Sequence, residues 1–170
     1  MPEVGSGDGW SIAQDRQGLH KLGLRGPWSD SIDRALREAA WDRVSLQAVE
    51  WNDYTPLLPF RERLQRLAVF DGPSKVAGLD QLDQLTDLDL LQARLSAAPQ
   101  LELLGKLARL EIFWKKGIAP AVLSLPELRH LLIAAFPWDD LTVVEKPSVA
   151  WLELREGSIR STDSRRIAFL

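Results

Sequence analysis

Two acidic residues, Asp89 and Glu111, are 22 positions apart in a chain whose leucines recur at nearly the same interval. If that interval places them on neighbouring strands, their backbones lie roughly 5 Å apart. A carboxylate pair at such a spacing can serve a retaining glycosidase or bind a hard cation. Arg109, two residues before Glu111, favours charge balance instead. A hydrolase or metal site that uses Asp89 and Glu111 is therefore an alternative and not the main hypothesis.

Other catalytic chemistry has few candidates. The chain contains only two histidines, His20 and His130, and no cysteine, which excludes disulfides, thiolate metal ligands and cysteine nucleophiles. On the strand ladder described below, the histidines are five strands apart, roughly 24 Å, and cannot share a metal ion. Ser45 is one strand from His20 but in another column, so a Ser-His-Asp set is not indicated. We expect no enzyme activity, no cofactor and no bound metal.

The composition is that of an ordinary soluble domain. Of 170 residues, 45% are apolar and 26% are charged, and the net charge is −3. We therefore expect no general attraction to nucleic acid or to an anionic membrane. The first ten residues lack the basic start and apolar run of a signal peptide, and no apolar run is long enough to span a bilayer. A cytoplasmic location is expected, and secretion as an effector stays open.

The elements that position these side chains follow from a repeated pattern, Leu-x-x-Leu-x-Leu. The pattern fits seven times, its starts are 21 to 23 residues apart, and all 21 of its template positions are apolar. The triplets are Leu19-Leu22-Leu24, Trp41-Val44-Leu46, Leu64-Leu67-Val69, Leu85-Leu88-Leu90, Leu107-Leu110-Ile112, Leu128-Leu131-Ile133 and Val149-Leu152-Leu154.

Each unit of the pattern predicts one strand. Its fourth and sixth positions alternate with polar neighbours, which is the period of a half-buried strand. A parallel strand from the next unit, about 4.8 Å away, continues the ladder and the core. The connecting segments must return on the other side. Residues 31–40 predict a short helix with Asp30 or Ser31 as its N-cap, and Pro99 suits the first turn of another over 99–106.

This pattern resembles the leucine-rich-repeat family, most clearly over residues 82–90 and 125–131. The resemblance implies an α/β solenoid, a leucine-rich-repeat horseshoe with a parallel strand ladder on the concave face and short helices or irregular loops on the convex face. It also implies a ligand-binding concave face and no catalytic residue. Short, variable units are similar to bacterial members. The family's Asn or Cys at position nine is missing, which points to a diverged loop geometry. Its place is taken by Pro27, Val49, Gly72, Ala93, Lys115, Phe136 and Gly157.

Three regions are expected. Residues 1–18 comprise a flexible, glycine-rich lead-in over 5–9 and an N-terminal cap strand that contains Trp10 and Ile12. Residues 19–154 hold the repeats, which start at positions 19, 41, 64, 85, 107, 128 and 149. Residues 155–170 form a C-terminal cap or a shortened last repeat. Caps are expected because a bare terminal unit would expose core.

Side chains at positions three, five and seven of each unit point out of the strand face. Basic residues dominate the first units and acidic residues the later ones. Phe70, Leu91 and Phe113 form an apolar stripe that either contacts a ligand or turns into the core, and Trp151 is the best single contact candidate. The expected protein-binding residues are Arg43, Arg66, Asp87, Asp89, Arg109, Glu111, His130, Trp151 and Glu153.

The sequence thus predicts a non-catalytic module that binds another protein through the concave strand face. Mixed basic, acidic and aromatic groups suit a protein surface. Self-association as a structural protein is one alternative, and the hydrolase or metal site is the other. We expect a monomer or weak homodimer with no nucleic-acid or membrane partner. Immunity protein, effector and scaffold stay open as biological roles.

Overall fold

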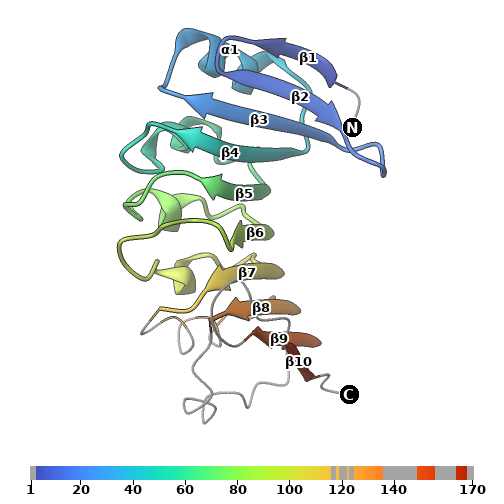
Figure 1. The fold of residues 1–170 in the computed structure, drawn as a ribbon, viewed down its shortest axis with the longest axis vertical. Coiled ribbons are helices and arrows are strands. Elements are labelled where there is room, and N and C mark those ends of the chain that lie inside the picture. Colours follow the sequence, from blue (N-terminus) through green and yellow to red (C-terminus); the bar gives the residue numbers. More distant parts are fainter. Residues whose placement is uncertain are drawn as a thin grey trace.

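The computed structural model describes residues 3–115, 118, 122, 125–135, 149–155 and 164–167. Its main element is one open sheet of ten strands, stacked in the order in which they occur in the chain (Figure 1). Strands β3 to β9 run parallel, whereas β1, β2 and β10 are antiparallel to their neighbours. The strands are β1 Glu3–Gly7, β2 Trp10–Gln14, β3 His20–Gly26, β4 Arg43–Val49, β5 Arg66–Asp71, β6 Asp87–Leu90, β7 Arg109–Phe113, β8 His130–Ala134, β9 Trp151–Arg155 and β10 Ser164–Ile167.

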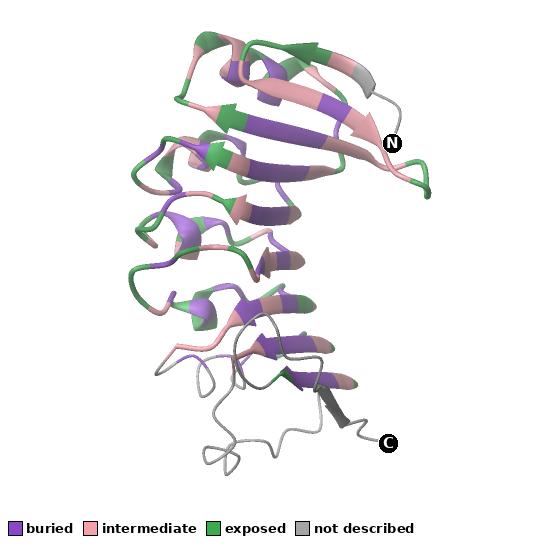
Figure 2. Ribbon diagram, in the orientation of Figure 1, coloured by how far each residue is buried: buried purple, intermediate pink, exposed green. Residues whose placement is uncertain are grey.

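The parallel ladder places equivalent apolar residues side by side, as the sequence predicts. The first core residue of each parallel strand pairs in register with the next, and each is at most 3% exposed. Figure 2 shows buried positions along the strands of the ladder. Alternation therefore directs one face of the sheet into a continuous core. This column comprises Leu22, Val44, Leu67, Leu88, Leu110, Leu131 and Leu152.

The described helices contribute to that same core and so cover one face of the sheet. They are α1 Asp30–Glu38 and the 3₁₀ helices η1 Thr55–Phe60, η2 Leu79–Gln81 and η3 Leu101–Leu103. Each helix contributes at least one buried leucine to the cluster. We call the opposite side of the sheet the open face, because no described helix lies on it.

The helix expected over residues 31–40 is present as α1, but its N-cap is one residue earlier than predicted. Ser29, in an extended conformation, accepts a hydrogen bond from the backbone N–H of Ile32 through its hydroxyl at 3.3 Å. Asp30 and Ser31 already belong to the helix, so the prediction of either as N-cap is wrong. The Ser31 hydroxyl is used elsewhere, because it accepts a hydrogen bond from the Trp10 indole N–H at 2.9 Å.

The glycine-rich segment over residues 5–9 is not a flexible lead-in. Residues 5–7 belong to β1, which pairs with β2 in an antiparallel hairpin. Glycine is required there because the Trp10 ring folds back over Gly7, where a Cβ would overlap the indole nitrogen. The strand expected around Trp10 and Ile12 is present as β2, and Ile12 packs into the core at 8% exposure.

At the other end, β10 runs antiparallel to β9, so it is not a further parallel strand of the ladder. This direction favours the cap interpretation of residues 155–170 over the shortened repeat. Residues 156–163 and 168–170 lie outside the described part of the chain. Among the described residues, no helix combines the length and apolar character needed to cross a membrane.

Arg63, in the turn between η1 and β5, contacts the C-terminal end of α1. Its guanidinium donates to the carbonyl oxygens of Leu36 at 3.3 Å and Ala39 at 2.6 Å, and lies 4.1 Å from the centre of the Trp41 ring. We expect Arg63→Ala to lower the free energy of unfolding by about 1–3 kcal/mol, because it removes charged hydrogen bonds and a cation–π contact. Urea unfolding followed by circular dichroism measures this change.

Arg61→Ala is the matched control, since among the described residues the Arg61 guanidinium pairs with its exposed neighbour Glu62 alone, at 3.5 Å. Its effect should stay within about 0.5 kcal/mol. Arg63→Lys should restore only part of the loss, because one ammonium group cannot span several carbonyls. Equal effects of the two alanine variants would show that the Arg63 contacts contribute nothing.

Candidate functional site

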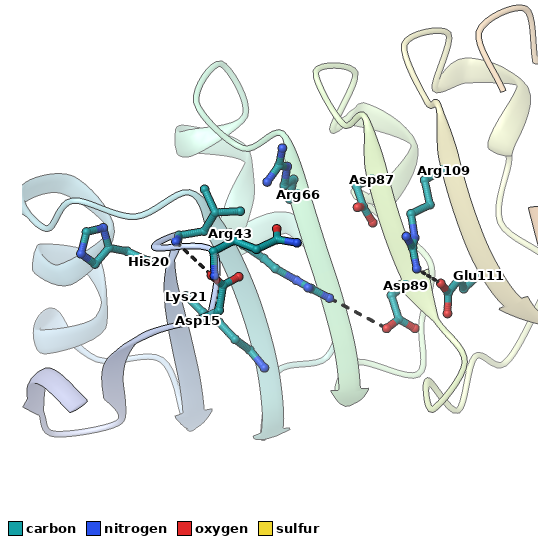
Figure 3. Close-up of a pocket in the computed structure, with 11 residues that line it drawn as sticks. Asp15, His20, Lys21, Arg43, Arg66, Asp87, Asp89, Arg109 and Glu111 are labelled. Carbon is teal, nitrogen blue, oxygen red and sulfur yellow. Dashed lines mark hydrogen bonds and ion pairs between the residues drawn. The ribbon is translucent and has the colours of Figure 1, made fainter. Parts of the chain in front are cut away.

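The open face contains a hollow of about 330 Å³ that extends from the β2–β3 turn across the strands to β7 (Figure 3). Ten of its eleven lining residues have charged, titratable or amide side chains, and these include both cations and acids, so the hollow is polar and open to solvent rather than an apolar pocket. The lining residues are Asp15, Gln17, Leu19, His20, Lys21, Arg43, Arg66, Asp87, Asp89, Arg109 and Glu111.

Long cationic side chains reach across this hollow over small residues. Arg43, on β4, passes over β5 and approaches Asp89 on β6, at 4.0 Å between Nη2 and Oδ2 (Figure 3). Lys21, on β3, passes over β4 and lies 4.7 Å from the centre of the Phe70 ring on β5. Small side chains occupy the strand positions beneath the extended Arg43 and Lys21 side chains. They are Gly23, Ser45 and Ala68, which pair in register.

Six charged side chains of the hollow divide into two halves, and Arg109 stands among the acids. Three cations, Lys21, Arg43 and Arg66, stand at equivalent positions on β3, β4 and β5; we call them the cationic half. Three acids, Asp87 and Asp89 on β6 and Glu111 on β7, form the acidic half. The structure therefore brings together six of the nine residues expected to bind a protein: Arg43, Arg66, Asp87, Asp89, Arg109 and Glu111.

Pairing within the hollow is incomplete. Arg109 donates to Glu111 on the same strand, as expected from charge balance, and Arg43 is near Asp89. Among the described residues, Lys21, Arg66 and Asp87 have no ion-pair partner within 4.0 Å. The hollow therefore retains charge of both signs that an external group can meet.

Burial and repulsion between like charges disfavour the charged forms of Asp89 and Lys21. Burial raises the pKa of the Asp89 carboxyl, and the neighbouring Glu111 raises it further, although a hydrogen bond from the Leu91 backbone N–H opposes the shift. Burial, followed by repulsion from Arg43, lowers the pKa of Lys21. Both pKa shifts mean that the ionised form is less stable in the protein than in water, so keeping either group charged costs free energy.

His130 and Trp151 lie beside the hollow on β8 and β9. Their rings are stacked, with centroids 3.9 Å apart and planes at 14°, and His130 Nε2 is 3.7 Å from Glu111 Oε1. Burial and the nearby Arg109 lower the pKa of His130. One face of the half-buried Trp151 ring is thus covered by His130, which leaves less of Trp151 available than its outward position predicts.

Glu153 is the one expected contact residue that is buried, at 2% exposure. Its carboxylate accepts a hydrogen bond from Arg155 Nε at 2.7 Å. The prediction of Glu153 as an exposed contact is therefore wrong. The neighbouring Leu132, at the equivalent position of β8, is also buried, at 3% exposure. The open face is consequently most accessible between β3 and β7.

The β2–β3 turn also lines the hollow, although the outward positions of the leucine pattern do not predict it. The Asp15 carboxylate accepts hydrogen bonds from the backbone N–H groups of Gln17 at 2.8 Å and Leu19 at 3.0 Å. These bonds fix the turn beside Lys21. The combination of Asp15 with Gly18 three residues later is a turn pattern that would have located it.

Asp89 and Glu111 do lie side by side in register, as the sequence spacing predicts. Arg109 is bonded to the Glu111 carboxylate, so one member of the pair is already neutralised. Within the described residues, no group of three or more histidine, aspartate or glutamate side chains is placed to hold a metal ion. Charge recognition is the chemistry that this arrangement supports directly.

Comparison with known proteins finds no relative: no family model matches the chain, and no curated protein or solved structure matches it. The geometry of the hollow therefore has to support any functional inference.

Proposed function

We propose that the chain is a leucine-rich-repeat horseshoe that binds another protein through its concave strand face, without catalysis. Support for the repeat comes from the seven parallel strands of the described chain, whose first core residues pair in register. Helices that pack only on the opposite side of the sheet are typical of such solenoids. The open face of the sheet is then the concave face.

The observation that best supports a binding function is the charged hollow on a sheet face that no described helix covers. Small-molecule pockets are mostly apolar, which this hollow is not. Nucleic acid is disfavoured because acids share the surface with the cations. A half-buried aromatic residue, Phe70, adjoins the charges, since its ring centre lies 4.7 Å from the Lys21 ammonium nitrogen. Charged groups that set register beside aromatic groups that add affinity are typical of protein interfaces.

Affinity capture from a lysate of the source organism, quantified by mass spectrometry, tests this proposal. The triple variant Arg66→Ala/Arg109→Ala/Trp151→Ala should lose at least about tenfold of any specific partner, because truncating a few central contacts removes most binding energy. The matched control is Arg34→Ala/Arg61→Ala/Trp28→Ala, which removes two exposed arginines and the exposed Trp28 from outside the open face. Equal recovery of every partner by the two variants would contradict the proposal.

Self-association is a second candidate function with one supporting observation. Among the described residues the sheet is not closed, so the outer strands β1 and β10 each leave one edge without a strand neighbour. Such edges can pair with a second copy. Sedimentation velocity over a hundredfold concentration range separates the candidates, since a strict monomer leaves only partner binding.

A further inference from the structure

We propose that the partner binds as a dipolar protein segment, with an acidic side chain on the cationic half of the hollow and a basic side chain on the acidic half. This inference rests on the proposed function and specifies the partner's chemistry. Its physical basis is the separation of opposite charges across one hollow, together with the groups that stay unpaired there.

Ion pairing leaves the cationic half partly uncompensated within the described residues: Asp87 lies opposite Arg66 in register and Asp15 stands on the adjoining turn, but neither forms an ion pair with Lys21 or Arg66. Lys21, Arg43 and Arg66 occupy one position on three consecutive strands, so like charges lie opposite each other from β3 to β5, which is destabilising. Only Arg43 forms an ion pair with an acid among the described residues. A carboxylate placed between Lys21 and Arg66 would relieve this repulsion. Arg66 has the fork of donors that binds a carboxylate through two hydrogen bonds.

The acidic half has the complementary arrangement. Asp89 and Glu111 are neighbours in register, and Asp87 lies two residues before Asp89 on the same strand. Arg109 is bonded to Glu111, and Asp87 has no cation within 4.0 Å among the described residues. The Asp89 side chain is already 77% buried, so an arriving cation would meet a carboxylate that water hydrates poorly. A lysine or arginine side chain would supply the missing positive charge.

The two halves neutralise each other only weakly. Within the described residues, the one ion pair between them joins Arg43 and Asp89 at 4.0 Å, which is too long for a hydrogen bond. A partner segment could displace this contact and offer each side chain a hydrogen-bonded counter-charge. Arg43 and Asp89 would then each exchange a long contact for a hydrogen-bonded ion pair, so that neither charge is desolvated without a partner.

The strand spacing sets the distance between the partner's charges. The cationic half is centred on β4 and the acidic half on β6 and β7, so their centres are two to three strand spacings apart, about 10–14 Å. An extended chain that rises about 3.3 Å per residue covers this distance in three or four residues. The partner segment should therefore carry its acidic and basic side chains three or four positions apart.

Two short peptides of equal composition test the inference. The acetylated and amidated peptide Glu-Glu-Ala-Ala-Lys-Lys separates its charges by the expected distance, whereas Ala-Lys-Glu-Glu-Lys-Ala has no net separation and no acid three or four positions from a base. Titration into the full ¹⁵N-labelled chain at low salt, followed by amide chemical shifts, gives both affinities. The first peptide should bind at least about fivefold more tightly and shift the amides of residues 21, 66, 87 and 111, and the binding should weaken in 0.3 M salt.

Lys21→Gln/Arg66→Gln should abolish the preference between the peptides, and the matched pair Lys75→Gln/Arg34→Gln should preserve it. If the double variant does not fold, the comparison of the two peptides on the wild-type chain decides alone. Equal binding of the peptides, or no binding by either below about 10 mM, would overturn the inference. Inorganic phosphate is the third probe, and a phosphate affinity above that of the charge-separated peptide would also overturn it in favour of a simple anion site.

The peptide titrations and the capture experiment distinguish a failure of dipolar recognition from a failure of protein binding. If the Arg66/Arg109/Trp151 variant loses a captured partner while the peptides bind alike, partner binding stands and the dipolar recognition falls. If capture is unaffected by that variant, the protein-binding proposal itself is wrong.

Discussion

Replacement of Leu88 by alanine is expected to lower the free energy of unfolding by about 3–5 kcal/mol. Leu88 is fully buried on β6, where it pairs in register with Leu67 and Leu110. The flanking strands are held by their own ladder hydrogen bonds, so they cannot close the space that the side chain leaves. The cost therefore includes the lost burial and a residual cavity. Equilibrium unfolding in urea, monitored by tryptophan fluorescence, measures the change.

Leu103→Ala is the matched control, because Leu103 is the same residue type at 53% exposure on η3. It should change the free energy of unfolding by less than about 0.5 kcal/mol. Similar losses at the two positions would mean that the stacked leucines do not dominate stability. The same measurement also tests cooperativity, since an unchanged urea dependence indicates that the whole sheet still unfolds together.

The strand ladder was predictable because its determinants are local and repeated. Alternation around Leu22 and Leu24 fixes which face of one strand is buried, and a register slip of one residue would direct Lys21 and Arg25 toward the core instead. Repetition at nearly constant spacing then fixes the neighbour of each strand. The same spacing places Asp89 beside Glu111, as the structure shows.

The ends of the sheet were less predictable because their structure depends on contacts with distant residues. Glycines at 5 and 7 have low strand propensity, yet the segment is a strand because it pairs with β2 and leaves room for the Trp10 ring. Glu153 follows the outward alternation of its strand but is buried beside Arg155. Burial of an outward position depends on what lies over it, which the alternation pattern does not contain.

The residues of the candidate site were mostly predictable, whereas the shape of the hollow was not. The outward positions of the leucine pattern predict that Arg43, Arg66 and the acids of β6 and β7 share one face, and all of them line the hollow. The reach of Arg43 across β5 to Asp89 depends on a long side chain over a small one, Ala68. That combination involves three strands and has no local sequence pattern. The wall formed by the β2–β3 turn was missed for the same reason, since its tie to the hollow is tertiary.

Replacement of Gly78 by alanine is expected to lower the free energy of unfolding by about 3 kcal/mol or more. Gly78 has a φ of +83°, and a Cβ there would lie 2.8 Å from the backbone nitrogen of Thr55. The left-handed conformation alone costs an L-residue about 1–2 kcal/mol, and overpacking adds about 1–3 kcal/mol. The opposing atoms cannot move easily, because the adjacent Tyr54 is fully buried and its N–H donates to the Ala77 carbonyl at 3.0 Å.

Two other glycines separate the conformational cost from the steric one. Gly26 has a φ of +67° with no atom within 4 Å of its added Cβ, so Gly26→Ala should cost only about 1–2 kcal/mol. Gly105 has open space and no left-handed backbone angle, so Gly105→Ala should be neutral or slightly stabilising. If Gly78→Ala costs no more than Gly26→Ala, the loop at Tyr54 and Thr55 yields to the new methyl group. A larger cost shows instead that loops from neighbouring strands pack rigidly, so that the connections, and not only the stacked leucines, hold the strands in register.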